Sequence, residues 1–334
     1  MNSPMSHPLP IPITHQPRIG VLSNPWSGRN QKDLQQIQDV LTQHPRLLQC
    51  EVHTPQDIEA AVEDFAKQQV DIIAINGGDG TVQAVLTALF SHKPFATLPM
   101  LAVFPGGTTS MIAGDVGLRG NRARALQRLL SWRPSHKPAP LLLQRAILGV
   151  ESATLPQPLC GMFFGAGGIL QGINFCRTAV HPLGLRGEVG PGLALARFLM
   201  ALIRNRADML QPIHMTVSMD GQPSQTRTCL MVLVSSLNRL IVGVRPYWGT
   251  EPGPLHYTEL GAHPRHLLRM LPSLLRGRPH QYATPINGYI SRNLQEVNLN
   301  LPSGFTLDGE LFHPEGDTQS VTIRTAGEVT FLRV

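Results

Sequence analysis

Three glycine-rich turns in the early part of the sequence have the composition of phosphate-binding loops. They read Asn24-Pro25-Trp26-Ser27-Gly28, Gly77-Gly78-Asp79-Gly80-Thr81 and Pro105-Gly106-Gly107-Thr108-Thr109. Glycines let the backbone approach a ligand closely, and they leave amide N–H groups available to donate to phosphate oxygens. A single turn of this kind is weak support for a site, but three in succession favour a phosphate-binding function.

A pair of carboxylates near the other end of the chain could accept a proton from a reacting hydroxyl. Asp308 and Glu310 flank a glycine in the segment Leu307-Asp308-Gly309-Glu310, so both can approach one site. The competing interpretation is a plain hairpin turn at Asp308-Gly309, which turn statistics favour when the segment is considered alone. Combined with the upstream glycine turns, the pair favours catalysis, and the sequence leaves open which carboxylate is the base.

The elements that position the glycine turns are predicted to be alternating strands and helices. Apolar runs at 19–22, 70–75 and 100–104 each precede one turn, and helical spacing follows at 31–43, 58–69 and 82–90. A further strand is predicted at 50–54. Near-continuous apolar strands separated by helices indicate a parallel sheet covered on both faces. Ligands bind at the carboxyl ends of such strands, which is where all three turns fall.

The pattern changes near residue 138 to short alternating runs separated by turn residues. Such runs occur at 141–148, 213–219, 228–235, 295–301, 321–324 and 329–333, and they indicate an antiparallel β region. Helical inserts are predicted at 193–206 and 264–275. The expected fold class is therefore α/β plus β, with an α/β domain at 18–138 and a β-rich, sandwich-like domain at 139–334. The proline-rich residues 1–17 are predicted to be a disordered leader and not a signal peptide.

The 334 residues carry a formal net charge of +6, and its distribution is uneven. The balance is −4 over residues 1–115, +14 over 116–295 and −4 over 296–334. An anionic partner is therefore expected at the middle of the sequence. The longest apolar stretch, 193–203, is too short to span a membrane, and the four widely spaced cysteines favour free thiols in a reducing cytoplasm.

Several other functions are disfavoured by missing motifs. The sequence has no G-x-x-x-x-G-K-[ST] loop, no protein-kinase signature and no G-x-S-x-G nucleophile elbow. The run Gly165-Ala166-Gly167-Gly168 lacks the spacing of a dinucleotide fingerprint, so we interpret it as a tight bend or a close backbone contact. His263 and His266 lack partner ligands for zinc.

Taken together, these motifs resemble the diacylglycerol-kinase-like lipid kinases, a family that includes sphingosine kinases and bacterial lipid kinases. The resemblance runs from about residue 18 to 334 and rests on Asn24-Pro25-x-Ser27-Gly28, Gly77-Gly78-Asp79-Gly80-Thr81, Pro105-x-Gly107-Thr108 and Leu307-Asp308-Gly309-Glu310. The second motif is shared with the more distant NAD kinases. The family architecture is an α/β nucleotide domain followed by a β-sandwich, with the active site in the cleft between them.

The resemblance implies an ATP-dependent transfer of the γ-phosphoryl group to a lipid hydroxyl, diacylglycerol-like or sphingoid, with Mg²⁺ accompanying ATP. Asp308 and Glu310 would be the catalytic pair. The implied nucleotide-binding residues are Asn24, Ser27, Gly28, Thr54, Gly77, Gly78, Asp79, Gly80, Thr81, Gly107 and Thr108. The alternatives are a non-catalytic nucleotide- or lipid-binding protein and an NAD kinase.

The sequence departs from the family pattern in a loop that holds a structural Mg²⁺ in many bacterial members. The matching stretch is 246–255, where Pro252 replaces an aspartate and only Glu251 could substitute as a ligand. Mg²⁺ requires near-octahedral geometry, so the metal ligands stay unknown. Two further segments depart from the family pattern. Val82-Gln83-Ala84-Val85 follows the second turn where the family often has x-N-E-V, and Ser110-Met111 follows the third turn where the family usually has an Asn-Asp pair.

The segments 119–145 and 265–292 are basic, and neither contains an acidic residue. A solvated basic face over a core stripe is one interpretation, and docking on anionic lipid headgroups is the other. Nucleic acid is not expected as a partner, because aromatic residues for base stacking make up only 5% of the chain. The expected location is the cytoplasm with peripheral membrane association, and the sequence does not indicate an oligomeric state.

Overall fold

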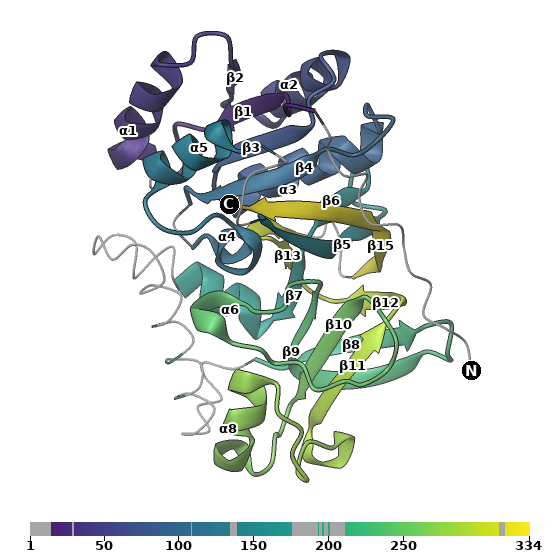
Figure 1. Ribbon diagram of the computed structural model, residues 1–334. Helices are drawn as coiled ribbons and strands as arrows, with labels where there is room; N and C mark the ends of the chain where they lie inside the picture. The colour runs from purple at the N-terminus through teal and green to yellow at the C-terminus, as the bar shows by residue number, and fades with distance from the viewer. Residues whose placement is uncertain are drawn as a thin grey trace, which may run out of the picture.

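The protein is described by a computed structural model over residues 15–28, 30–107, 109–133, 139–175, 211–313 and 318–334, together with Leu193, Ala196 and Met200. Most of the predicted leader 1–17 and of the predicted helix 193–206, and also Thr108, lie outside the described residues. The chain forms an upper and a lower half in Figure 1, joined by long strands.

Four parallel strands form the centre of the upper half, in the hydrogen-bonded order β2-β1-β3-β4. Their bounds are β1 Ile19–Ser23, β2 Leu48–Glu51, β3 Ile72–Gly77 and β4 Met100–Pro105. Strand β3 is buried along its whole length: Ile73 and Ile75 pack into one hydrophobic cluster and Ile72 and Ala74 into another. Burial on both faces explains the near-continuous apolar run in the sequence.

Helices cover both faces of this parallel sheet. They are α1 Asn30–Thr42, α2 Pro55–Lys67, α3 Asp79–Thr87, the π-helical turn η1 Ala88–His92, α4 Met111–Val116 and α5 Arg122–Ser131. Helices α2, α3 and α4 share one apolar cluster with the sheet, whereas α1 and α5 contribute to the cluster on the opposite face. The turns that follow β1, β3 and β4 therefore lie together at one edge, as the alternating pattern predicts.

The remaining strands are mainly antiparallel, and most of them lie in the lower half of Figure 1. Their bounds are β5 Leu141–Ser152, β6 Leu159–Gly161, β7 Phe163–Gly167, β8 Ile213–Met219, β9 Gln225–Ser235, β10 Leu255–Gly261, β11 Tyr289–Leu294, β12 Glu296–Leu301, β13 Phe305–Leu307 and β14 Glu310–Phe312. Alternate residues such as Met215, Val217 and Met219 of β8 face a shared core. This period of two is the pattern that predicts half-buried strands.

The final strand, β15 Gln319–Arg333, joins the two halves into one hydrogen-bonded sheet. It pairs with β12 in the lower half and β5 along its length, and Phe331 reaches Leu101 of β4 in the upper half. The sequence pattern suggested two short runs here instead of one strand. The interruption is a bulge between Thr325 and Gly327. Gly327 has a φ of +154°, and an added Cβ would clash with the Phe90 ring, so this position has no room for a side chain.

Short helices complete the lower half. They are α6 Gly168–Phe175, α8 Leu267–Arg276 and the single turns η4 Ile241–Gly243 and η5 Pro285–Asn287. Helix α8 confirms the helical spacing seen at 264–275, although it begins only after His266, which is in a left-handed conformation. None of the helices in the described part of the chain is long and apolar enough to cross a membrane.

The architecture confirms the predicted fold class, with parallel strands and helices first and antiparallel strands after them. The predicted boundary between residues 138 and 139 stays a prediction. The return of β15 to the upper sheet could not be read from periodicity, because an apolar strand pattern does not specify its neighbours.

Candidate active site

One large cavity, of about 920 Å³, lies where the glycine turns meet the lower half of the molecule. Its polar end is lined by residues of all three glycine turns, although not by the predicted Gly77, and by Asp308 and Glu310 from the opposite end of the sequence. Its apolar end extends between α6, β9, η4, β10 and α8. The cavity therefore has two chemically distinct regions.

The first two glycine turns are held together by direct hydrogen bonds. The Gly78 backbone N–H donates to the Ser27 hydroxyl at 3.0 Å, and the Asn24 side-chain amide donates to the Thr81 hydroxyl at 3.2 Å. The Asn24 side-chain oxygen also accepts the backbone N–H of Trp26 at 2.9 Å. These contacts fix the two turns relative to each other and place the N-terminus of α3 at the cavity, where its dipole favours an anion.

A buried polar network that the sequence analysis missed fixes the backbone of the first glycine turn. The Asn30 side-chain amide donates to the backbone carbonyls of Asn24, at 2.6 Å, and Asn76, at 3.0 Å. Arg122 of α5 in turn donates to the Asn30 side-chain oxygen at 2.5 Å. Asn76 directly precedes the second glycine turn, so its position in the sequence could have indicated a role at this site. Nothing in the sequence links Arg122 to the site.

The third glycine turn packs tightly against the second. A Cβ added at Gly107 would lie 2.6 Å from the Gly78 Cα, so only glycine permits this approach. Asp79 locks the arrangement, because its carboxylate accepts the backbone N–H groups of Met111 and Ile112, both at 2.9 Å, at the start of α4. The nucleotide-site prediction at Thr108 lies outside the described residues, and Gly107 lines the cavity.

Thr54 and Gly28 also line the cavity. Strand β2 ends at Glu51, so Thr54 lies beyond it and not inside the predicted strand 50–54, and it is the N-cap of α2. Its hydroxyl accepts the Asp57 N–H at 3.2 Å, and the Asp57 carboxylate accepts the Thr54 N–H at 2.8 Å, which forms a capping box. The position is therefore fixed by local helix chemistry.

Asp308 is held firmly at the edge of the cavity. It accepts the backbone N–H of Phe163 at 2.9 Å and that of Met162 at 3.0 Å, and it is only 3% exposed. Asp308 and Gly309 form the two-residue loop between β13 and β14, with φ values of +49° and +93°. Both sequence interpretations are thus compatible, since the segment is a tight hairpin and also brings Asp308 to the cavity.

Glu310 differs from Asp308 in its surroundings. It is exposed at the first position of β14, and its side chain lies over Gly80, where an added Cβ would be 2.9 Å from Oε1. Gly80 stands in the first turn of α3, so Glu310 faces the same helix N-terminus that the second glycine turn creates. The structure therefore brings the predicted pair to one cavity but in different environments.

Burial raises the pKa of both Asp79 and Asp308. Desolvation raises the pKa of Asp79 to about 6, against the lowering effect of the Met111 and Ile112 amides. Desolvation also raises the pKa of Asp308 well above its usual range, and the nearby Asp79 carboxylate raises it further. Two carboxylates that repel each other at a cavity favour either a proton or a cation between them.

The donor chemistry at this end of the cavity fits Mg²⁺, which prefers oxygen ligands. Asp79, Asp308 and Glu310 all border the cavity. The described residues nevertheless contain no group of three acidic, histidine or cysteine side chains able to enclose a metal ion. A cation here would therefore complete its coordination with phosphate oxygens and water.

Glu251, the candidate replacement in the 246–255 loop, lies away from the cavity lining. Its carboxylate accepts the backbone N–H groups of Thr250, at 3.1 Å, and Asn293, at 3.2 Å. The Asn293 side-chain amide donates to the carbonyls of Gly249 and Glu251. The Asn293 side-chain amide therefore links the 246–255 loop to strand β11, and the Glu251 carboxylate accepts backbone N–H groups at this junction.

The apolar end of the cavity was not identified from the sequence. Its lining side chains come from five separate segments: Ile169, Ile173, Met231, Leu233, Leu240, Ile241, Val244, Leu260, Leu274 and Leu275. Gly172, in the middle of α6, also lines it, and a Cβ added there would meet nothing within 4 Å. Apolar residues in a cavity wall have the same sequence pattern as core residues, so periodicity cannot separate the two.

The structural interpretation of Gly165-Ala166-Gly167-Gly168 is confirmed. A Cβ added at Gly167, which has a φ of +71°, would lie 2.6 Å from the Leu230 carbonyl oxygen, and one at Gly165 would clash with Ile169. These glycines let β7 and the start of α6 pack closely against β9 and thereby form one wall of the cavity.

Comparison with known proteins agrees with this geometry. Residues 18–137 match the family described as the diacylglycerol kinase catalytic domain. The fold is similar to a crystal structure of a candidate diacylglycerol kinase from Bacillus anthracis strain Sterne, with a TM-score of 0.63 and 16% identity over 94% of this chain and 96% of that chain. A second structure, of a diacylglycerol kinase from the same organism, has a TM-score of 0.57 and 16% identity over 94% and 96% of the two chains. No curated protein matches the sequence significantly.

Proposed function

We propose that the chain is an ATP-dependent lipid kinase that phosphorylates a lipid hydroxyl, because residues 18–137 match the family described as the diacylglycerol kinase catalytic domain. The observation that carries this proposal is a cavity that contains both the glycine turns and a long apolar chamber. The family supports a kinase, and the apolar chamber supports a lipid as the acceptor. Aliphatic side chains from five segments favour an acceptor with a large apolar part, because burying that part against them removes apolar surface from water.

The polar end of the cavity is suited to the triphosphate. Backbone amides of the glycine turns and the N-terminus of α3 supply donors and a favourable dipole for phosphate oxygens. Mg-ATP supplies the transferable phosphoryl group and the compensating positive charge. Ser27 and Asn24 hold the first two turns in register, so they position the donors without needing to contact the reacting atoms themselves.

Asp308 is the proton acceptor in this proposal. Two backbone amides fix its orientation, and burial raises its pKa toward the range in which a carboxylate is an effective general base. Glu310, exposed over Gly80, is placed to contact Mg²⁺ or its bound water. This assignment gives the two carboxylates separate roles: Asp308 accepts the acceptor hydroxyl's proton, and Glu310 would help to hold the cation.

The acceptor lies with its acyl chain among α6, η4 and α8 and its hydroxyl toward Asp308. Aliphatic side chains such as Ile169 of α6 and Ile241 of η4 give this end of the cavity the character that an acyl chain needs. Leu311 and Phe312 of β14 continue the lining from Glu310 toward the chamber. A lipid bound in this way presents its polar head to the glycine turns, which is the orientation that an in-line transfer needs.

The test is phosphoryl transfer from γ-labelled ATP to diacylglycerol, sphingoid and phospholipid acceptors dispersed in neutral detergent micelles, with NAD as a soluble acceptor in parallel. We expect a labelled lipid product and none with NAD. Intact ATP binding without transfer to any lipid would contradict the proposal and favour a non-catalytic binding protein. Label on NAD alone would favour an NAD kinase.

A further inference from the structure

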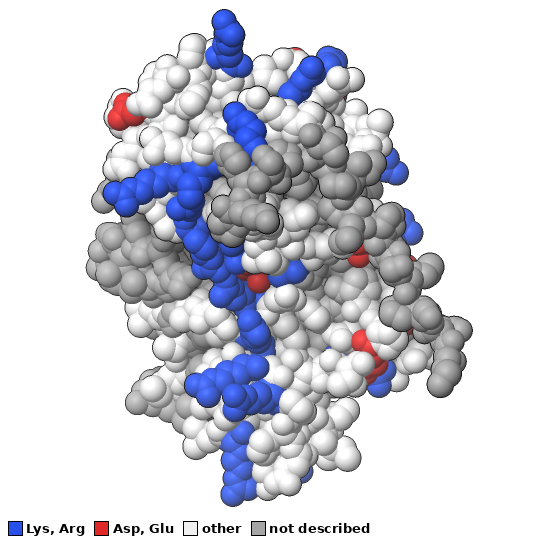
Figure 2. Space-filling model, in the orientation of Figure 1, with Lys and Arg blue, Asp and Glu red and all other residues white. Residues whose placement is uncertain are grey.

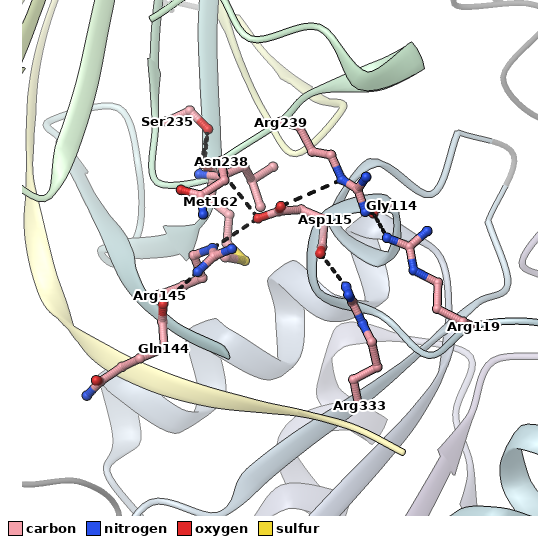
Figure 3. Close-up of polar contacts among 11 residues, drawn as sticks. Gly114, Asp115, Arg119, Gln144, Arg145, Met162, Ser235, Asn238, Arg239 and Arg333 are labelled. Atoms are coloured by element: carbon pink, nitrogen blue, oxygen red, sulfur yellow. Dashed lines mark hydrogen bonds and ion pairs between the residues drawn. The ribbon is translucent and has the colours of Figure 1, made fainter. Parts of the chain in front are cut away.

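Four arginines from four separate segments converge on the end of the short helix α4. They are Arg119 in the α4–α5 loop, Arg145 in β5, Arg239 after β9 and Arg333 in β15, and we call them the arginine cluster. Figure 3 shows their guanidinium groups directed toward Gly114 and Asp115. The cluster lies outside the cavity lining, so the proposed reaction does not account for it.

Asp115 is the acid at the centre of this cluster. Its carboxylate is 4% exposed and contacts the Arg145 Nε at 3.0 Å and the Arg239 Nε at 3.8 Å. The Arg333 guanidinium donates to the Asp115 backbone carbonyl at 2.5 Å, and Arg119 donates to that of Gly114 at 3.1 Å. One carboxylate and a helix C-terminus thus face four positive charges, and the cluster keeps a net positive charge.

The arginines are close enough to affect one another. The pKa of Arg333 is lowered by burial and by the charges of Arg119 and Arg145, and Asp115 offsets this only in part. Like charges held together by backbone contacts are stabilised when an external anion approaches. The cluster is therefore a fixed concentration of positive charge that is partly buried, since the Arg145 side chain is 12% and the Arg239 side chain 31% exposed.

The positive charge continues from the cluster to helix α8. Arg245 is exposed, and its backbone N–H donates to the Leu275 carbonyl at 3.0 Å, which ties the loop after β9 to the end of α8. Gly277 packs against the Arg245 carbonyl, so Arg276 and Arg278 lie beside it, and both are exposed. Figure 2 shows basic side chains as a band down this face, from the upper half to the lower. We call the cluster and these three arginines the basic band.

The loop from Asn238 to Arg245 connects the basic band with the apolar cavity. Ile241 and Val244 line the cavity, whereas Val242 between them is 51% exposed. Val242 also has a φ of +56°, which is unusual for a β-branched residue, and it lies in the same loop as Arg239 and Arg245. The outer side of the loop from Asn238 to Arg245 therefore combines positive charge with an exposed apolar group. The inner side of the same loop lines the proposed acceptor chamber.

We propose that the basic band and Val242 form the surface by which the protein docks on an anionic lipid bilayer. The choice of a bilayer over another polyanion rests on the proposed function and on Val242, because an aliphatic side chain gains from contact with acyl chains and not from contact with phosphates alone. A nucleic acid would match the charge but not the exposed valine. The docking surface would hold the acceptor chamber close to the lipid that it must take up.

The test is co-sedimentation of the full chain with phosphatidylcholine vesicles that contain or lack phosphatidylglycerol, without ATP. The variant Arg245→Gln/Arg276→Gln/Arg278→Gln should lose about a hundredfold in binding to the anionic vesicles, because each basic residue near such a surface contributes about fivefold. The matched control is Lys67→Gln/Lys93→Gln/Arg324→Gln, which removes the same charge elsewhere and should lose far less. Equal losses in the two variants would overturn the proposal.

Three further measurements separate this inference from its alternatives. Val242→Asn suits a positive φ better than valine, so it should leave the fold intact while weakening vesicle binding severalfold. Duplex DNA at the same phosphate concentration should not displace the protein from anionic vesicles, and displacement would show that the band fits nucleic acid instead. Transfer to lipid in neutral micelles should be the same in wild type and band variants. Failure of that transfer in the wild type would contradict the proposed function without affecting the vesicle result.

Discussion

The two ends of the cavity are built in opposite ways. At the polar end, each functional group is fixed by specific hydrogen bonds: Asp79 by two amides of α4, Asp308 by two amides of β7 and its preceding residue, and Ser27 by Gly78. At the apolar end, aliphatic side chains from α6, β9 and α8 leave an open space. For the proposed kinase, rigid polar groups suit one invariant triphosphate, whereas a chamber without directional contacts suits acyl chains of different shapes.

Removing one of the fixed carboxylates at the polar end is expected to have the largest effect. Asp308→Asn should lower kcat by about 10²- to 10⁴-fold, because the proton acceptor is lost while the shape is kept. ATP affinity, measured by calorimetry, should change little. Glu310→Gln is the matched comparison and should raise the Mg²⁺ requirement more than it lowers the maximal rate. A larger loss of kcat in Glu310→Gln than in Asp308→Asn would mean that Glu310, and not Asp308, is the proton acceptor.

The second test fills the apolar end. Gly172→Trp should raise KM for a long-chain acceptor by at least about tenfold, since the new ring occupies the open space that the Cβ of this residue faces. KM for ATP should not change. Gly172→Ala is the control: it should keep activity and raise the free energy of unfolding by about 1 kcal/mol, because alanine favours the helix. A loss of activity in the Gly172→Ala variant would mean that α6 must bend at this position.

The third test compares two glycines of the polar end. Gly107→Ala forces a Cβ to 2.6 Å from the Gly78 Cα, whereas Gly78→Ala places its Cβ at 3.1 Å from the Gly107 Cα. We expect Gly107→Ala to weaken ATP binding by about tenfold or more and Gly78→Ala to weaken it less, as small displacements of positioning groups have large effects. Equal ATP affinities in the two variants would show that this end tolerates movement as well as the apolar end does.

The smallest expected effect concerns pH. The pKa of Asp79 is raised from 3.8 to about 6, so the folded state binds more protons than the unfolded state in that range. The free energy of unfolding should therefore fall as pH rises from about 4 to about 6, and Asp308 acts in the same direction. Asp79→Asn should make this decline less steep in urea unfolding. Gly172→Ala, at the apolar end, should leave the slope unchanged.

The polar end was largely predictable from sequence and the apolar end was not. Glycine turns after apolar strands have few explanations other than close backbone approach, so Gly77-Gly78-Asp79-Gly80-Thr81 could be placed on the correct edge of the sheet. The exact role of Asp79 as a cap for α4 could not, because the short helix 111–116 has no clear periodic pattern. Leu275 and Val244 look like ordinary core residues until the fold leaves a space beside them.

Long-range pairing was the other limit. The run 329–333 was identified as a strand, but its partner β4 lies far away in the sequence. The hydrogen bonds that hold Asp308 depend on the register between β13 and β7, which no local pattern specifies. The convergence of Arg119, Arg145, Arg239 and Arg333 is likewise a product of tertiary structure, since the charge imbalance of the sequence indicated only a broad basic region.

The placement of β15 has a consequence for how the chain reaches its native state. Phe331 and Leu332 complete the apolar clusters on the two faces of the upper sheet, beside strands that are synthesised much earlier. Until residues 319–333 leave the ribosome, β4 has an unpaired edge, and such edges promote aggregation. The nascent upper half is therefore expected to wait, incompletely packed, until β15 has been made, which makes folding slow and dependent on long-range contacts.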